Sequence, residues 1–192
     1  MGYLRETHSK WKTFKMDLKT KNRFIYEMVD WTETIIIALI LALIIRKYII
    51  QTSMVPTGSM IPTLNIGDRL FVNKFIYRFV MPKRSDIIVF KSPYKNKNDY
   101  VKRCIGLPGE KIQIIKGVVY INDKQLVLPG VNVQRDYSFY GPVSVPEKSY
   151  FALGDNRGNS QDSRVWGFVP ENDLLGKAWF TFWPLNRMRL LR

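Results

Sequence analysis

The sequence predicts an all-β domain carried by one N-terminal transmembrane helix, and three observations support this fold class. One long apolar run lies near the N-terminus, where it has the character of a membrane span. Short segments rich in β-branched and aromatic residues follow, with turn signals between them. The chain has 192 residues, 46% of them hydrophobic, which suits one domain plus an appendage.

The apolar run reads IIIALILALII and extends from Ile35 to Ile45. Alone it is too short to cross a bilayer, which takes about 20 residues. Arg46 and Lys47 can reach the interface with their charged ends, so the flanks extend the span to residues 31–50. A cleavable signal peptide and a buried core helix are the alternatives. The late start of the run and the lack of an A-x-A-like site favour an uncleaved anchor.

The flanking charges predict the orientation of this anchor. The tail, residues 1–30, carries seven Lys or Arg residues, and such short basic segments stay in the cytoplasm. Long domains cross largely regardless of their charge. We therefore expect residues 51–192 to form an extracytoplasmic domain behind a single span.

Seven segments of residues 51–192 have the character of β-strands. They are Arg69–Phe75, Asp86–Phe90, Tyr100–Ile105, Lys111–Ile115, Gly117–Ile121, Ser149–Leu153 and Lys177–Trp183. The fourth and fifth read as a hairpin, because the turn signal Lys116-Gly117 joins them. Residues 129–148 contain two glycines and three prolines, which indicate a long loop or an insertion.

Counts of reactive residues limit the possible chemistry. The chain has one cysteine, Cys104, and one histidine, His8, which lies in the basic tail. An intramolecular disulfide is therefore excluded, and a Ser-His-Asp triad or a His-rich zinc site is nearly so. Hydrolytic chemistry in this chain would need a lysine or a carboxylate as its base. The net charge of +14 suggests nucleic acid or an anionic membrane surface as a neighbour, without choosing between them.

The stretch MVPTGSMIPTL, Met54–Leu64, contains the candidate nucleophile Ser59. Gly58 permits unusual backbone geometry, while Pro56 and Pro62 restrict the chain on either side. A serine in such a rigid turn can present its hydroxyl and its backbone N–H together, as nucleophile and oxyanion donor. A plain turn without a catalytic role is the alternative.

A candidate base lies in YVKRCI, Tyr100–Ile105. Strand alternation places Lys102 on one face with Tyr100 and Cys104, and no carboxylate shares that face. Burial without a counter-ion disfavours the ammonium form, so the pKa of Lys102 would fall towards the range of a general base. The alternative is a lysine whose stem lies on apolar surface and whose amine reaches solvent.

A third polar stretch, GDNRGNSQDSR, extends from Gly154 to Arg164. It could be a hydrophilic turn closed by an Asp162–Arg164 pair, or a loop that orients a catalytic side chain. Asp155 and Asp162 could also suggest an aspartyl dyad. Each has an arginine two residues later, however, which favours structural ion pairs.

Together and in this order, the anchor and four segments resemble the bacterial type I signal peptidases. The segments are PTGSMIPTL, GDRLFVNKF, YVKRCIGLPGE and GDNRGNSQDSRVWG, and the resemblance covers roughly Trp31 to the C-terminus. It implies a membrane-anchored serine endopeptidase with a Ser–Lys dyad. Such an enzyme removes signal peptides from exported preproteins after Ala-x-Ala-like sites, and it uses neither a metal nor an organic cofactor.

The resemblance also implies roles for individual residues. Ser59 matches the nucleophile and Lys102 the general base. Thr57 stands where the family usually has a serine that contributes, with the nucleophile, to the oxyanion hole. Ser160 matches the hydroxyl that positions the lysine. Residues that match those bracing the site are Asp162, Arg164 and Arg103.

The substrate pocket and the partners complete these expectations. Met54, Val55 and Met60 are bulky apolar residues beside Ser59 that could fill the space of the substrate pockets. The implied partners are preprotein signal peptides, membrane lipid and a nearby export machinery, but not nucleic acid. Two alternatives stay open: a soluble self-cleaving Ser–Lys repressor, and a non-catalytic basic membrane module that binds lipid or nucleic acid.

Overall fold

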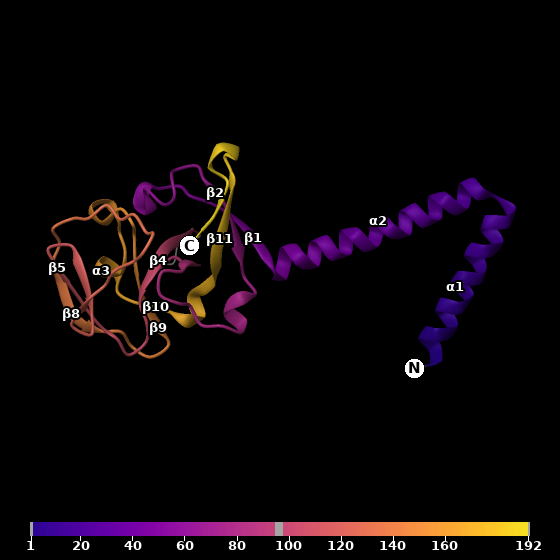
Figure 1. Cartoon of the computed structure of the whole chain (residues 1–192). Coiled ribbons are helices and arrows are strands. Elements are labelled where there is room, and N and C mark those ends of the chain that lie inside the picture. Colours follow the sequence, from indigo (N-terminus) through magenta and orange to yellow (C-terminus); the bar gives the residue numbers. More distant parts are fainter. Residues whose placement is uncertain (1, 95–97, 192) are drawn as a thin grey trace. The chain divides into compact units, whose positions relative to one another are not determined.

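The computed structural model describes residues 2–94 and 98–191, and the chain divides into two compact units. The first unit comprises Met1–Lys47 and the second Tyr48–Arg192 (Figure 1). Each unit is described by itself below. The second unit holds every β-strand.

The first unit consists of two helices, α1 (Gly2–Lys21) and α2 (Arg23–Tyr48). Asn22 separates them and caps α2, since its side-chain oxygen accepts the backbone N–H groups of the second and third helical residues at 3.1 and 3.3 Å. By length and composition α2 could cross a membrane, with a mean hydropathy of 2.2 over its most apolar stretch. Its helical structure begins before Trp31, and the tail preceding it is helical too, which the sequence analysis did not predict.

The second unit contains two antiparallel sheets. The larger has the strand order β1-β2-β11-β3-β4-β9-β10, with β12 paired to β11, and the smaller has the order β7-β6-β5-β8. The strands of the larger sheet are β1 (Ile50–Met54), β2 (Arg69–Asn73), β3 (Ile87–Lys91), β4 (Asp99–Gly106), β9 (Ser149–Leu153), β10 (Val169–Pro170), β11 (Leu174–Trp183) and β12 (Arg189–Leu190). Those of the smaller sheet are β5 (Lys111–Ile115), β6 (Val118–Ile121), β7 (Lys124–Gln125) and β8 (Tyr140–Ser144).

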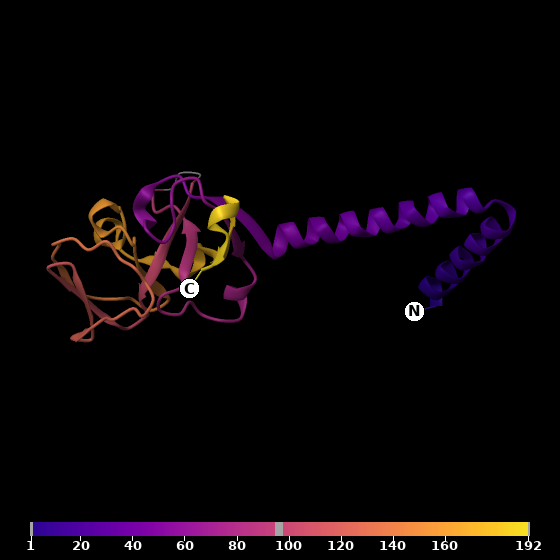
Figure 2. The ribbon, with the colours of Figure 1, turned by 45° about the horizontal axis from the view of Figure 1, so that its top comes forward.

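Short helical turns connect the strands. They are η1 (Gly58–Met60), η2 (Ile76–Arg78), η3 (Arg157–Asn159), α3 (Ser163–Trp166), η4 (Glu171–Asp173) and η5 (Leu185–Arg187). Both views place β5 and β8 at one end of this unit and β1 at the other (Figures 1 and 2). β4 lies between these two ends (Figure 1).

Three apolar clusters stabilise the unit. The first lies on the large sheet and includes Leu70, Val72 and Val89, together with Val55, Met60 and Leu64 from the segment after β1. The second joins the sheets, because Ile105, Phe151 and Leu153 of the large sheet pack with Ile112, Ile114, Val119 and Ile121 of the small one. The third contains Ile88, Phe90, Cys104, Tyr150, Ala152 and Val169. The first cluster fixes the segment that carries Ser59.

All seven predicted strands are present, with small differences at their ends. The predicted β5–β6 hairpin is confirmed, and its turn residues Lys116 and Gly117 have φ values of 49° and 76°, as a type I′ turn requires. The segment 129–148, predicted to be a loop or insertion, contains the strand β8. Pro142 obscured this strand in the sequence, but proline is tolerated because β8 is the edge strand of the small sheet.

Candidate active site

Ser59 lies in η1, in a segment held from two sides. Met60 and Leu64 are almost fully buried in the first apolar cluster, and the Leu64 N–H donates to the Met60 carbonyl at 2.8 Å. From the other side, the backbone N–H of Asn156 donates to the Ser59 carbonyl at 3.0 Å, and its side-chain amide donates to the Gly58 carbonyl at 3.1 Å. The turn that carries Ser59 is therefore fixed by both the core and the loop after β9.

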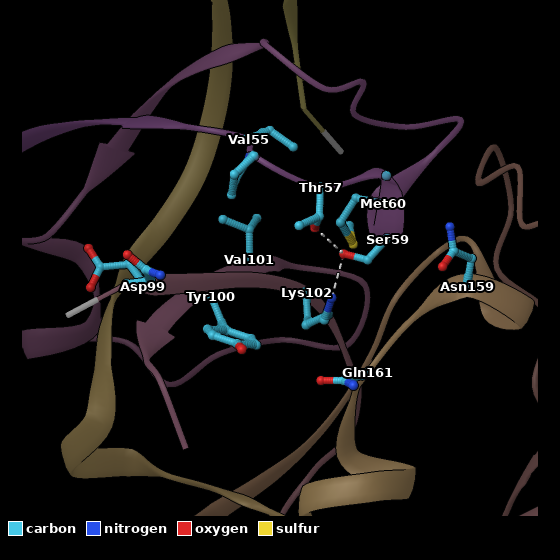
Figure 3. Close-up of a pocket in the computed structure, with 13 residues that line it drawn as sticks. Val55, Thr57, Ser59, Met60, Asp99, Tyr100, Val101, Lys102, Asn159 and Gln161 are labelled. Carbon is cyan, nitrogen blue, oxygen red and sulfur yellow. Dashed lines mark hydrogen bonds between the residues drawn. The ribbon is translucent and has the colours of Figure 1, made fainter. Parts of the chain in front are cut away.

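Lys102 lies in β4, opposite Ile88 of β3. Its face is the one that the alternation predicted, since Tyr100 and Cys104 pack with Ile88 in the third cluster. The side chain is 4% exposed, and Lys102 Nζ lies 2.5 Å from Ser59 Oγ (Figure 3). Two residues that are distant in sequence are thus in direct hydrogen-bond contact within a buried site.

Burial lowers the pKa of Lys102 to about 8 from its ordinary value of 10.5. The carboxylates of Asp162 and Asp155 partly oppose this shift through space, and Arg164 adds to it. Neither aspartate forms an ion pair with Lys102 among the described residues, because arginines occupy both carboxylates. A substantial fraction of Lys102 is consequently the neutral amine near pH 8, the form that can accept a proton.

Arg103, the next residue in β4, holds the first of these carboxylates. Its Nε and Nη2 atoms donate to the two oxygens of Asp155 at 2.8 and 2.7 Å, and both side chains are almost completely buried. Its Nη1 atom donates to the carbonyl of Ser85 at 2.8 Å, and Nη2 also donates to Thr63 Oγ1 at 3.3 Å. This paired, bidentate geometry satisfies a buried charge that would otherwise be costly.

Arg164 holds the second carboxylate. It donates from Nε to Asp162 Oδ1 at 2.8 Å and from Nη1 to Asp136 Oδ2 at 2.7 Å. Asp162 also accepts the backbone N–H of Gly154 at 3.1 Å and caps α3. The predicted Asp162–Arg164 pair is confirmed. Asp155 pairs with Arg103 rather than Arg157, and these separate arginine contacts argue against an aspartyl dyad.

Ser160 is placed beside the dyad, but its expected hydrogen bond to Lys102 is not formed. Ser160 Oγ is buried and has no hydrogen-bond partner within residues 2–94 and 98–191. Gly154 separates it from the nucleophile: a Cβ atom at Gly154 would lie 2.2 Å from Ser160 Oγ and 2.5 Å from the Ser59 carbonyl oxygen. Only glycine therefore allows the loop after β9 to approach the site this closely.

Thr57 precedes η1 and points its hydroxyl at the nucleophile (Figure 3). Thr57 Oγ1 lies 3.5 Å from Ser59 Oγ, a long and weak hydrogen bond. The residue is exposed, so its hydroxyl can reorient towards a bound substrate.

A cleft of about 370 Å³ opens on the dyad (Figure 3). Of the three predicted pocket residues, Val55 and Met60 line it, whereas Met54 is 58% exposed in β1 and lies outside the lining. By alternation along β4, Val101 should lie on the face opposite Lys102, yet both residues line the cleft. The reason is that β9 pairs with β4 only from Arg103 onwards, so the edge of the first half of β4 is not covered by β9. Lining residues that the sequence analysis did not single out for the site include Asp99, Tyr100, Val101, Asn159 and Gln161.

The described residues do not form the kind of cluster that a metal-binding site requires. No group of three or more His, Cys, Asp or Glu residues in the described ranges is placed to hold a metal ion. The carboxylates nearest to the dyad are engaged by arginines instead. What the site offers chemically is a serine hydroxyl beside a buried amine, an arrangement suited to nucleophilic catalysis.

A buried serine–lysine contact on an antiparallel β scaffold is an arrangement suited to a serine hydrolase. A family model described as "Signal peptidase, peptidase S26" matches residues 28–183. The chain belongs to this family and is a signal peptidase, a hydrolase that cleaves signal peptides. Because the chain belongs to this family, the two alternative interpretations, a self-cleaving Ser–Lys repressor and a non-catalytic basic membrane module, no longer apply.

Two relatives agree with this assignment. The chain is 44% identical over 169 residues to a probable signal peptidase I-2 of Synechocystis sp., covering 84% of this chain and 77% of that protein. It is 39% identical over 184 residues to signal peptidase I T of Bacillus subtilis, covering 89% and 93%. A crystal structure of a signal peptidase I from Enterococcus faecalis has 36% identity and a TM-score of 0.42, covering 51% of this chain and 97% of that one.

The close approach at Gly154 gives a testable prediction. Gly154→Ala should lower kcat/KM for a preprotein by about 100-fold, since the added Cβ must displace the Ser59 carbonyl or Ser160 by a fraction of an ångström or more. Gly158→Ala is the matched control in the same loop, because its Cβ would meet only Asp136 Cβ, at an ordinary 3.8 Å. Equal turnover by both variants would contradict this role of Gly154.

Proposed function

We propose that the chain removes signal peptides from exported preproteins by attack of Ser59 on the scissile carbonyl, with Lys102 as the general base. The observation that carries this proposal is the 2.5 Å contact between Lys102 Nζ and Ser59 Oγ inside a buried site. Because burial lowers the pKa of Lys102 to about 8, the amine can be neutral at a pH where the enzyme works.

The reaction follows from this geometry. Neutral Lys102 takes the Ser59 hydroxyl proton as the oxygen bonds to the carbonyl carbon. Collapse of the tetrahedral intermediate breaks the peptide bond, and the lysine ammonium protonates the departing amine. The acyl-enzyme is then hydrolysed by a water molecule that gives a proton to Lys102 and leaves the signal-peptide carboxylate. Acylation therefore returns Lys102 to the neutral amine and leaves Ser59 as an ester. In deacylation the lysine ammonium gives the proton from the water to the departing Ser59 oxygen, which restores the hydroxyl and the neutral amine, and the product acid loses its own proton to solvent.

The oxyanion is stabilised by the backbone N–H of Ser59 and the hydroxyl of Thr57. Support for the second donor comes from the position of Thr57 Oγ1, 3.5 Å from Ser59 Oγ and free to turn towards substrate. Loss of one such donor lowers kcat by about 10²–10³-fold in other serine hydrolases. Thr57→Ser keeps the hydroxyl and Thr57→Ala removes it. The ratio of the kcat values of these two variants therefore measures how much the Thr57 hydroxyl contributes to stabilising the oxyanion.

The surrounding polar residues position Lys102 and keep it neutral. Arg103 and Arg164 engage Asp155 and Asp162, which prevents either carboxylate from pairing with the lysine. The unpartnered hydroxyl of Ser160 is available to accept a hydrogen bond from Lys102 once the amine has taken up the Ser59 proton. These residues act through Lys102 rather than on the substrate.

The dyad predicts the effect of substitution and of pH. Ser59→Ala and Lys102→Arg should both abolish cleavage, because one loses the nucleophile and the other keeps a charge that cannot accept a proton. In the parent enzyme kcat/KM should rise about tenfold per pH unit below pH 8 and level off above it, as Lys102 loses its proton. Lys111→Arg, at a half-exposed ion pair with Asp123, is the control and should keep both activity and profile. Substantial turnover by Lys102→Arg would refute the general-base assignment.

Specificity follows from the apolar side of the cleft. Val55, Met60 and Val101 narrow the space beside Ser59, and a closed pocket excludes a large side chain by sterics. The substrate is proposed to lie extended along β4, so residues one and three before the cut point to the same side. This arrangement favours Ala-x-Ala-like sites.

Peptides that differ only in the residue before the cut test this specificity. We expect efficient cleavage after Ala or Gly and almost none after Leu, Phe or Lys, measured as kcat/KM in detergent or liposomes. Similar values for Ala and Phe would show that the pocket is open.

The proposed topology is a single span with a cytoplasmic N-terminus and the catalytic unit outside, close to membrane lipid and to the export machinery. It is supported by the apolar helix α2 and by the seven cationic residues before Trp31. Protease added to intact spheroplasts should digest the second unit. Protection of that unit until the cells are lysed would rule out this orientation.

A further inference from the structure

We propose that Asn159 and Gln161 form a subsite for the residue immediately after the cut, the first residue of the mature protein. We further propose that this subsite favours a polar side chain over a bulky apolar one. The inference rests on the proposed function, since it assumes that Ser59 and Lys102 cleave the peptide bond.

The dyad divides the cleft into two ends. On one side β4 runs from Lys102 back to Asp99, which at about 3.3 Å per strand residue lies roughly 10 Å away. On the other side, the loop that carries Asn159 and Gln161 is tied to η1 by the hydrogen bonds of Asn156. Figure 3 shows the same order, with Asp99 at one side of the dyad and Asn159 at the other.

The point at which the chain enters the second unit indicates which end receives the signal peptide. Gln51 Nε2 donates to Asp99 Oδ2 at 2.9 Å, which places the start of β1 at the Asp99 end of the cleft. Gln51 follows Tyr48, the last residue of α2, by three residues, a reach of about 10 Å. A signal peptide has its apolar segment before the cut. The residues before the cut therefore enter from the Asp99 end, and the residue after it meets Asn159 and Gln161.

The two ends also differ in chemistry. Val55 and Val101 give the end before the cut apolar surface, and the carboxylate that lines this end, Asp99, accepts a hydrogen bond from Gln51, whereas the other end presents two exposed carboxamides. A carboxamide both donates and accepts hydrogen bonds, so it can bind acidic, amide or hydroxyl side chains. A large apolar side chain would cover these amides without replacing their hydrogen bonds to water, which lowers its affinity.

Gln161 contributes to the proposed subsite through its position relative to Lys102 in the cleft. It lines the cleft together with Lys102, and Figure 3 draws its side chain below Lys102, on the side away from Thr57. Lys102 protonates the departing nitrogen in the proposed reaction, and that nitrogen belongs to the first mature residue. Gln161 and Asn159 thus both line the part of the cleft that this residue would enter.

The test uses the full chain in detergent with peptides that are identical up to the cut and carry Ser, Gln, Asp or Leu after it. The parent should favour the polar residues by roughly tenfold in kcat/KM. Gln161→Leu and Asn159→Leu should each reduce or reverse this preference. Gln125→Leu, an exposed residue of β7 outside the cleft, is the matched control and should keep the parental ratio.

The possible outcomes separate the two proposals. Failure of the parent to cut any of the peptides would overturn the proposed function, and the subsite with it. Cleavage of all four at equal rates, or equal ratios in Gln161→Leu and Gln125→Leu, would overturn the subsite alone. A pH profile of Gln161→Leu with its midpoint still near 8 supports a subsite, whereas a moved midpoint would show that Gln161 acts on Lys102 instead.

Discussion

The rest of the site depends on two arginine–aspartate pairs whose carboxylates act on Lys102 through space without forming an ion pair with it. Arg103 engages Asp155, and Arg164 engages Asp162, so burial remains the dominant influence on the lysine and lowers its pKa. Strand alternation makes this possible, because consecutive residues of β4 point to opposite faces. Lys102 faces the nucleophile while Arg103 reaches the aspartate behind it. One strand therefore supplies both the proposed base and an arginine that engages a neighbouring carboxylate.

The same loop serves the geometry and the electrostatics of the site. Residues 154–164 contribute both aspartates and the hydrogen bonds of Asn156 to η1, and at Gly154 they pass close to the Ser59 carbonyl. Since η1 is also anchored by Met60 in the core, the nucleophile is held between two rigid supports. The dyad is consequently preorganised, and substrate binding does not need to assemble it.

Much of this arrangement could be read from the sequence because it depends on local patterns. Alternation gave the strands and the face of Lys102, and the lack of a carboxylate on that face indicated its lowered pKa. The partner of Asp155 could not be predicted, since Arg103 lies 52 positions away and the nearer Arg157 fits local spacing equally well. The place of Val101 in the cleft was missed because it depends on where β9 stops pairing with β4. Met54 was misplaced by proximity in sequence, which says nothing about the direction of its side chain in β1.

The buried lysine also affects the folding equilibrium of the second unit. The pKa of Lys102 is about 8 in the folded chain and near 10.5 when the chain is unfolded, so folding at neutral pH confines an ammonium in a site that disfavours it. This lowers the free energy of unfolding by on the order of 3 kcal/mol below pH 8. The deficit shrinks as the pH rises from 8 to 10.5, because the folded chain has then lost the proton that the unfolded chain still binds, and it vanishes above 10.5. At neutral pH the fold therefore carries a destabilised catalytic centre, which the three apolar clusters must offset.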